Sequence, residues 1–195
     1  MSINHSPLKS LIHILPPSVL EEFTNSFAEV KLLKGESLLR INQVCRHMYI
    51  VKKGAVRHFR IAKDGSEYNT WFSFEDDIIA VLKSTVRESP SNTGIIAMED
   101  TTFLSISQSE IDNLRIKHHS FETFSRRLIE EYFIFMEQRA FSAQANTALQ
   151  KYAELLSANP KVMDRVTQTQ IASYLGIKKE TFTRIKKKMK NLSSS

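Results

Sequence analysis

The stretch TQTQIASYLGIKKETFTRIKKKMK, residues 167–190, contains two short helical patterns separated by a single glycine. Thr167 can cap the first helix while the side chain of Gln170, at the third helical position, bonds back to it. Gly176 then supplies the left-handed backbone conformation with which helices commonly end. We therefore predict two helices joined by a tight turn, the first of which buries Ile171, Ala172 and Leu175.

The second helix of this pair, from Lys179 to about residue 190, is predicted to have two different faces. Apolar residues recur at the spacing of one inward face, namely Phe182, Ile185 and Met189. The opposite face then carries a carboxylate, a hydroxyl, a guanidinium and an ammonium group, from Glu180, Thr183, Arg184 and Lys187. Such groups bond base edges in the major groove, because arginine can donate to both acceptors of guanine and glutamate can accept from cytosine.

Positive charge is concentrated at the same end of the chain. Residues 161–195 carry nine Lys and Arg against two acidic residues, a net charge of +7, whereas residues 1–160 have a net charge of −1. This asymmetry indicates a polyanionic partner for one end, and lysines suit phosphates, which position a protein on DNA without specifying sequence. A helical unit that makes only protein contacts is the alternative. The predicted DNA contacts are Thr167, Thr169, Lys178, Lys179, Glu180, Thr183, Arg184, Lys187 and Lys188.

Upstream of this region the periodicity changes along the chain. Residues 7–29 predict a short helical segment, in which Pro16-Pro17-Ser18 precedes apolar residues at helical spacing. Residues 30–107 alternate in short runs with hairpin turns predicted at 52–55 (KKGA) and 62–67 (AKDGSE), a pattern typical of a β-sandwich or barrel. The predicted strands are SLLRI (37–41), HMYIVKKG (47–54), AVRHFRIA (55–62), YNTWFSF (68–74) and TTFLSIS (101–107).

A helical period returns from residue 119 to about residue 157. Two adjoining apolar stripes give this helix an apolar face that is wider than contact with a single neighbouring element requires. One stripe can lie on the β-domain and the other can pair with the same helix of a second chain, while burial within one chain is the alternative. Asn159-Pro160 breaks the helix, and residues 158–166 are predicted to link it to the last unit. The stripes are Phe121, Phe124, Leu128 and Phe135, and Ile129, Tyr132, Met136 and Ala143.

The composition excludes several classes of function. Cys45 is the only cysteine, so neither an intramolecular disulfide nor a four-thiolate metal site can form within the chain. No spacing matches a nucleophile with its base, a Gly-rich phosphate loop or a metal site, so we expect no enzyme and predict no cofactor. The apolar runs are too short to span a membrane and the N-terminus lacks signal-peptide features, so a cytoplasmic location is expected.

These patterns resemble a known family. TQTQIASYLGIKKETFTRIKKK, residues 167–188, resembles the C-terminal helix-turn-helix of the Crp/Fnr family of bacterial transcription regulators. LLKGESLLRINQVCRHMYIVKKGAVRHFRIAKDGSEYNTWF, residues 32–72, resembles the family's cyclic-nucleotide-binding-type β-roll, and AMEDTTFLSIS, residues 97–107, is similar to its last strands. The likeness follows the family's order over nearly the whole chain, so it is more specific than a helix-turn-helix alone.

The resemblance implies an α+β fold in three parts. These are an N-terminal antiparallel β-roll (double-stranded β-helix, jelly-roll-like) effector domain over residues 1–118, a dimerisation helix over 119–145, and a helix-turn-helix DNA-binding domain over 146–195. It also implies a homodimer that reads double-stranded DNA through Lys179, Glu180 and Arg184. RNA polymerase and a small-molecule effector are the further partners that the resemblance implies.

The phosphate cassette of nucleotide-binding members is not preserved. In those members a Gly-Glu pair and an Arg-Ser/Thr-Ala run hold the ribose and the cyclic phosphate through a carboxylate, backbone amides and a guanidinium. Here Asp76-Asp77 stands where the Gly-Glu pair would fall, and Ser91-Asn92-Thr93 replaces the second run. Two carboxylates without an arginine repel a phosphate, so we expect no useful binding of cyclic AMP or cyclic GMP unless Arg87 substitutes.

The β-roll is then expected either to bind another small effector or to act as a scaffold. Trp71, Phe72 and Phe74 can stack on an apolar effector, with a purely structural place in the core as the alternative. A second hypothesis for the whole chain is a small-molecule or cyclic-nucleotide sensor whose basic C-terminal region makes nonspecific nucleic-acid or protein contacts. The candidate effector-pocket residues are Trp71, Phe74, Asp76, Asp77, Arg87, Ser91, Asn92 and Thr93.

Overall fold

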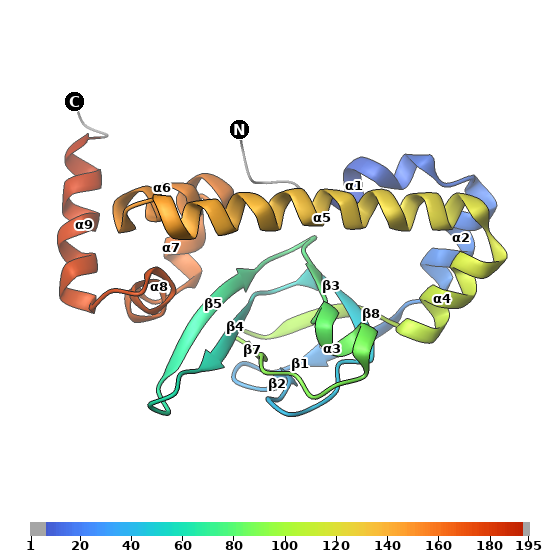
Figure 1. Cartoon of the computed structure of the whole chain (residues 1–195), viewed down its shortest axis with the longest axis horizontal. Helices are drawn as coiled ribbons and strands as arrows, with labels where there is room; N and C mark the ends of the chain where they lie inside the picture. Colours follow the sequence, from blue (N-terminus) through green and yellow to red (C-terminus); the bar gives the residue numbers. More distant parts are fainter. Residues whose placement is uncertain (1–6, 193–195) are drawn as a thin grey trace.

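A long helix, α5 (His119–Ala145), runs along the molecule and joins a β-rich part to a helical part (Figure 1). The computed structural model describes residues 7–192. The elements before α5 are α1 (Pro7–Leu11), η1 (Ile12–Ile14), α2 (Pro17–Asn25), β1 (Ala28–Leu32), β2 (Ser37–Leu39), β3 (His47–Lys53), β4 (Val56–Ile61), β5 (Glu67–Ser73), β6 (Ile78–Ile79), α3 (Leu82–Arg87), β7 (Gly94–Ala97), β8 (Thr101–Ser107) and α4 (Gln108–Lys117). The elements after it are α6 (Ala148–Ala158), α7 (Val162–Arg165), α8 (Gln168–Leu175) and α9 (Lys179–Leu192).

Within the described residues, the strands form two antiparallel sheets of four strands each. Their orders are β1-β8-β3-β6 and β2-β7-β4-β5. Side chains alternate between the two faces of each strand, so one face of each sheet turns toward the other. The core between the sheets includes Val51, Val56, Ile95 and Phe103. Two antiparallel sheets followed by helices confirm the predicted α+β class and β-roll.

The five predicted strands are present as β2, β3, β4, β5 and β8, with small shifts at their ends. The hairpin predicted around Asp64-Gly65 is confirmed, because β4 pairs with β5 and Gly65 has φ +84°. The strands β1, β6 and β7 and the helix α3 were not predicted. The strands β6 and β7 have two and four residues, which is too short for the alternation of apolar and polar residues to be visible in the sequence.

The turn predicted at residues 52–55 is not a hairpin, because β3 and β4 lie in different sheets. Gly54 has φ +107°, and a Cβ atom there would lie 2.5 Å from Oγ1 and 2.7 Å from Cα of Thr101. The chain therefore crosses from one sheet to the other at a point where only glycine fits. A turn signal in the sequence reveals the bend, but it does not reveal whether the strands on either side of it pair.

The N-terminal helices pack with α4 and the first half of α5 on the β1-β8-β3-β6 sheet. The ring of Phe23 in α2 lies 5.1 Å from that of Phe121 and 6.0 Å from that of Phe124, both in α5. Ile50 and Ile106 of the sheet belong to the same cluster. The predicted helical segment at the start of the chain is thus confirmed, and it fixes α5 onto the β-roll.

The helix predicted from residue 119 to about residue 157 is two helices. Helix α5 ends at Ala145, and α6 begins after Thr147, whose side-chain oxygen accepts a hydrogen bond from the Gln150 amide. Gln150 in turn accepts a hydrogen bond from the Thr147 backbone amide at 2.8 Å. This capping box starts a new helix, and the periodicity of the two helices is too similar for the break to be visible in a stripe pattern.

Helix α5 turns one face to the β-roll and another to solvent. Tyr132, assigned above to the second stripe, lies instead on the inner face, where its hydroxyl donates to the Ile78 carbonyl at 2.8 Å. Phe133 was absent from both stripes and is 72% exposed. A row of exposed apolar residues follows the outer face at alternating spacings of four and three residues: Ile129, Phe133, Met136, Ala140 and Ala143.

The helices α6 to α9 share an apolar cluster with one end of the β-roll. Phe182 of α9 and Ile171 of α8 are completely buried, and the ring of Tyr152 in α6 lies 5.0 Å from that of Phe182. The segment predicted as a linker contains α7, and its Val162 is also completely buried. Ala55, Phe72 and Phe74 of the β-roll complete the cluster. The connecting segment is therefore part of a core that both parts of the chain build.

The substitution Gly54→Ala tests the close approach between the two sheets. It should lower the free energy of unfolding by more than about 3 kcal/mol, because backbone overlap adds to the strain of a positive φ, which alone costs about 1–3 kcal/mol. Gly35→Ala is the matched control, since φ is +89° there but nothing lies within 4 Å of the added Cβ. Urea unfolding measures both variants, and equal losses would contradict the close approach.

Candidate DNA-binding face and sensor site

The start of α8 has the predicted capping geometry. The Thr167 hydroxyl accepts a hydrogen bond from the Gln170 amide at 3.3 Å, and the Gln170 side chain accepts one from the Thr167 amide at 2.9 Å. At the other end, Gly176 has φ +68° and caps the helix in the left-handed conformation. Ile171, Ala172 and Leu175 are buried as predicted. The turn between α8 and α9 is thereby fixed by local interactions.

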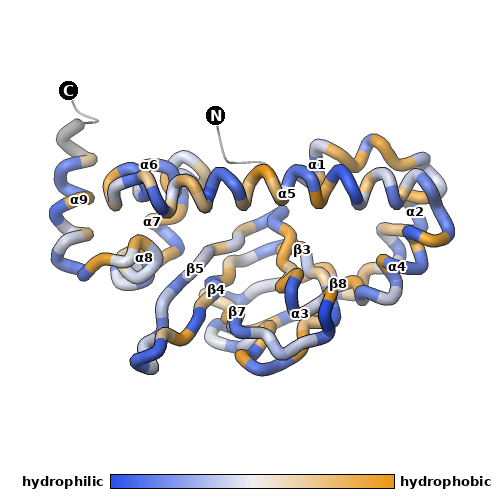
Figure 2. The backbone as a smooth tube through the Cα atoms, viewed as in Figure 1, coloured by the Kyte–Doolittle hydropathy of each residue, from blue (hydrophilic) through white to orange (hydrophobic). Residues whose placement is uncertain are grey.

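Helix α9 buries one face and exposes the other. Phe182 is completely buried, and Ile185 and Met189 pack partly buried on the same cluster, as predicted. Figure 2 shows α9 as a largely hydrophilic helix at the end of the molecule. The hydroxyl of Thr183 donates to the Lys179 carbonyl at 3.1 Å, so it must rotate to donate to a base. The nine predicted DNA contacts are all exposed: Thr167, Thr169, Lys178, Lys179, Glu180, Thr183, Arg184, Lys187 and Lys188.

The cations of this face have no acidic partner among the described side chains. The salt bridges of residues 7–189 involve neither Arg184 nor any lysine between residues 178 and 188. Unpaired exposed cations on one helix face produce a positive potential that attracts phosphates. We define the exposed residues Lys179, Glu180, Thr183, Arg184 and Lys187 as the reading face.

The two aspartates of the predicted sensor site have different environments. Asp76 adopts φ +71° in the turn after β5, and its carboxylate forms an ion pair with Lys9. Asp77 is largely buried and accepts a hydrogen bond from the Phe74 amide at 2.9 Å. Burial raises the pKa of Asp77 to about 6, the Phe74 amide opposes the shift, and the charges of Asp76 and Glu75 add to it. A cyclic phosphate would meet acidic groups here.

The second predicted cassette segment, residues 91–93, forms hydrogen bonds among its own polar groups. The buried Ser91 hydroxyl donates to the Thr93 carbonyl at 2.8 Å and accepts from the Thr93 amide at 3.0 Å. The hydroxyl of Thr93 accepts from Nε of Arg60 at 3.1 Å and bonds Asn92 at 3.5 Å. Arg87 is exposed at the end of α3. The loop thus has internal hydrogen bonds where nucleotide-binding members hold a phosphate.

The aromatic residues of the predicted site lie in two places. Phe72 and Phe74 are buried in the cluster shared with the helical part, so the structural alternative holds for them. Trp71 faces α5 instead, with the Arg139 guanidinium 4.1 Å above its ring and the Phe135 ring 5.4 Å away. The structure therefore does not gather the eight predicted pocket residues around one cavity that includes Trp71.

A cleft of about 1070 Å³ lies beside Trp71, between β5, α5, α6 and α8. Aromatic rings form part of its wall together with polar and charged side chains, and Arg139 donates to the Thr70 carbonyl at 2.8 Å within it. Burial lowers the pKa of Arg139. Burial and the nearby Arg139 charge lower the pKa of His58 to about 4, so this histidine is neutral. The sequence did not predict this cleft, because its walls come from four elements. They include Tyr68, Trp71, Phe135, Arg139, Phe141, Glu154 and Tyr174.

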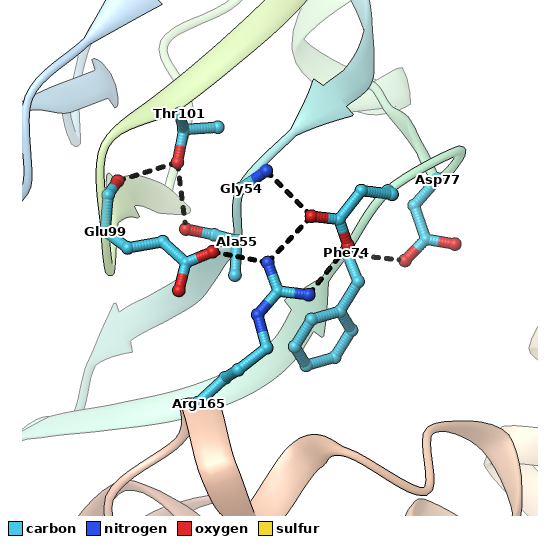
Figure 3. Close-up of polar contacts among 8 residues, drawn as sticks. Gly54, Ala55, Phe74, Asp77, Glu99, Thr101 and Arg165 are labelled. Carbon is cyan, nitrogen blue, oxygen red and sulfur yellow. Dashed lines mark hydrogen bonds and ion pairs between the residues drawn. The ribbon is translucent and has the colours of Figure 1, made fainter.

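Another group of residues that was not predicted joins the helical part to the β-roll (Figure 3). Arg165 of α7 donates to both carboxylate oxygens of Glu75, at 2.6 and 2.9 Å, and also pairs with Glu99. Its guanidinium lies 5.1 Å from the ring centre of Phe74. Burial alone would raise the pKa of Glu75, but hydrogen bonds from Arg165 and from the Gly54 amide outweigh it and hold the pKa at about 2. The pair therefore stays ionised throughout the physiological pH range.

Residues 7–192 contain no group of three or more His, Cys, Asp or Glu side chains placed to hold a metal ion. None of the helices described there is long and apolar enough to span a membrane.

The described part of the chain is thus a β-roll joined through a long helix to an exposed, basic helix-turn-helix. The comparisons find the same fold in known proteins. Residues 29–118 match the family model described as cyclic nucleotide-binding domain. No match was found among curated proteins.

Solved structures of transcription regulators have the same fold. FixK2 from Bradyrhizobium japonicum superposes with a TM-score of 0.72 at 17% identity, covering 86% of each chain. A protein assigned to the Crp/Fnr family from Eubacterium rectale gives 0.66 at 18% identity, covering 90% of this chain and 83% of that one. The Thermus thermophilus catabolite activator protein gives 0.51 at 19% identity, covering 94% and 87%. Residues 29–118 thus match the cyclic nucleotide-binding domain family, and most of the chain has the fold of the Crp/Fnr regulators.

The substitution Asp77→Asn tests the buried carboxyl. The pKa of Asp77 is raised to about 6 in the folded state. Between about pH 4 and pH 6 the folded chain therefore keeps a proton on Asp77 that the unfolded chain has lost. The stability that this protonated carboxyl contributes is complete below about pH 4 and is lost as the pH rises through 6. One pKa unit corresponds to about 1.4 kcal/mol, so Asp77→Asn should gain about 3 kcal/mol relative to the unsubstituted chain between pH 4 and pH 7. Denaturant unfolding at several pH values measures this difference, and parallel pH curves would contradict it.

Proposed function

We propose that the chain is a cytoplasmic, sequence-specific transcription regulator of the Crp/Fnr type that binds double-stranded DNA as a homodimer. The observation that carries this proposal is the reading face of α9, on which Arg184 and Glu180 are exposed and form no ion pair with the described side chains of residues 7–189. A guanidinium fork recognises guanine and a carboxylate recognises cytosine in the major groove. The neighbouring lysines supply phosphate contacts, and the buried Phe182 fixes the rotation of the helix.

The outer face of α5 supports the homodimer. Ile129, Phe133, Met136, Ala140 and Ala143 are exposed and alternate four and three residues apart, which is the heptad spacing of a coiled-coil seam. An exposed apolar row of this length on a single helix costs solubility unless a second copy covers it. In a parallel pair, two α9 helices about 34 Å apart would read a pseudo-palindromic site.

The sensor half supports regulation without cyclic AMP. Asp76 and Asp77 place acidic groups in the cassette, and Ser91 and Thr93 bond each other, so neither segment offers a phosphate site. The aromatic cleft beside Trp71 favours a planar small molecule as a second candidate function, a sensor whose ligand contacts both parts of the chain. RNA polymerase as a partner remains a prediction from the resemblance.

Selection of the ligand-free protein on a random duplex library, at about 150 mM salt to screen nonspecific binding, tests the proposal. An enriched site with two-fold symmetry is the expected result. Binding that depends on salt but enriches no sequence would instead favour the sensor with nonspecific nucleic-acid contacts. Calorimetry with cyclic AMP and cyclic GMP is the accompanying measurement, and heat of micromolar binding would overturn the interpretation of the cassette.

Arg184→Ala should relax base preference at one position of each half-site, at a cost of about 1–3 kcal/mol for the preferred base. Lys188→Ala is the matched control on the same helix, and it should weaken binding to all sequences alike and reduce the salt dependence. Competition binding with single-base variants of the selected site distinguishes the two. Unchanged discrimination in Arg184→Ala would show that the reading face is assigned wrongly.

Phe133→Asp should convert the dimer to monomer, because it places a charge within the apolar row. Ile116→Asp is the matched control: Ile116 is 85% exposed but lies on α4, away from the row. Sedimentation equilibrium measures the mass of each variant. A dimer that survives Phe133→Asp, or is lost in Ile116→Asp, would place the interface elsewhere.

A further inference from the structure

We infer that Arg165 is a positioning residue for DNA recognition: it holds the helical unit α6–α9 on the β-roll in the arrangement that leaves the reading face open, without any ligand. This inference rests on the proposed function. The unit follows α5 through the non-helical residues Asn146 and Thr147. Its orientation relative to α5 and the β-roll is therefore decided by the contacts that it makes beyond this connection.

Arg165 makes the strongest polar contact across this interface. Two nearly parallel hydrogen bonds to Glu75, at 2.6 and 2.9 Å, fix both the position and the plane of the guanidinium, which a single ammonium could not do. The pairing with Glu99 adds a second carboxylate, and the Arg165 side chain is only 21% exposed. The Glu75 and Glu99 side chains are 41% and 39% exposed, so it is the bidentate geometry and the second carboxylate, rather than burial, that define the position of Arg165.

The Glu75 carboxylate and the Glu99 backbone each have a hydrogen bond to the β-roll besides their contact with Arg165. Glu75 accepts a hydrogen bond from the Gly54 amide at 2.8 Å, at the crossover between the two sheets. The Glu99 carbonyl accepts from the Thr101 hydroxyl at 2.7 Å, and the same hydroxyl lies 3.3 Å from the Ala55 carbonyl. Figure 3 shows the Glu99 side chain extending toward the Arg165 guanidinium, with Thr101 bonded to the backbone of Glu99 and Ala55. Both acceptors thus lie in short turns next to strand ends, Glu75 between β5 and β6 and Glu99 between β7 and β8.

Two further contacts lock the same orientation. The Asn69 amide of β5 donates to the Ser173 hydroxyl at 3.0 Å, and its side chain donates to the Gln170 carbonyl at 3.1 Å, both in α8. Asn69 is 6% exposed, so these bonds are shielded from water. Since α8 is joined to α9 by the fixed turn at Gly176, a constraint on α7 and α8 is also a constraint on α9.

The orientation that results is compatible with DNA. In Figure 1 α9 lies at the end of the molecule, beyond α8 and away from the sheets, and its reading face is exposed. In a dimer, the separation of two α9 helices must match about one turn of DNA, so each unit has to be held at a defined angle. A unit that is free to rotate is competent only for a fraction of the time, and its apparent affinity falls by that fraction.

The test uses the full chain without ligand and compares Arg165→Ala with the matched control Arg115→Ala. Arg115 also forms a two-bond pair, with Glu122 at 2.5 and 3.1 Å, but at the opposite end of α5. Arg165→Ala should weaken binding to the selected site by about 10-fold, with base preference unchanged, whereas Arg115→Ala should leave affinity unchanged. Arg165→Lys keeps the charge without the fork, so it should fall between the two.

Orientation is measured separately from DNA binding. Spin labels at Lys83→Cys on α3 and Lys186→Cys on α9 report the distance between the β-roll and helix α9. Both positions are exposed, so both accept the label. The native Cys45 is buried and does not take the label. Arg165→Ala should broaden the distance distribution, and Arg115→Ala should not. This readout still decides the inference if the protein selects no DNA sequence, so its failure and that of the proposed function are distinguishable.

Two results would overturn the inference. One is a distance distribution in Arg165→Ala identical to that of the unsubstituted chain, and the other is a broadened distribution with unchanged DNA affinity. If Arg165→Ala does not fold, Glu99→Gln removes one charge of the network from an exposed position and takes its place in both measurements. A broadened distribution with weaker but equally selective binding supports the inference.

Discussion

The shared interface between the β-roll and the helices α6–α9 is the constraint on which the functional arrangement depends. Ala55, Phe72 and Phe74 of the β-roll lie in one apolar cluster with Val162 and Phe182 of the helical unit. A helical unit of about 50 residues buries a smaller fraction of its surface than a large domain does, so its stability by itself is marginal. We therefore expect the helices α6–α9 to gain stability from the core that they share with the β-roll.

This shared interface gives the β-roll a structural part that does not depend on the predicted cassette segments. The cassette segments are filled by their own hydrogen bonds, between Ser91 and Thr93 and between Asp77 and Phe74. The end of the β-roll that faces the helices, in contrast, carries Glu75 and Glu99 directed at Arg165. In this chain the sheets serve as a platform, and any ligand in the cleft beside Trp71 would act on the interface itself.

Local rules predicted much of the fold, because the interactions that set it are close in sequence. The longer strands follow from alternation, and the β4–β5 hairpin follows from Asp64-Gly65. The errors have a common origin. The turn at Gly54 is a crossover rather than a hairpin, the predicted helix after residue 119 breaks at Asn146, and Tyr132 lies on the inner face of α5. Each of these features depends on an element that is distant in sequence but close in space. A period or a turn signal contains no information about that neighbour.

The sequence by itself determined the helix-turn-helix: the Thr167–Gln170 capping box, the left-handed Gly176 and the amphipathic α9 are set by residues at most a few positions apart. It also determined that one end of the chain is cationic. Only the tertiary structure decided where that helix points. The bonds from Arg165 to Glu75 and from Asn69 to α8 join residues about 90 to 104 positions apart. Such contacts depend on the fold that brings these distant residues together, so no local sequence pattern can predict them.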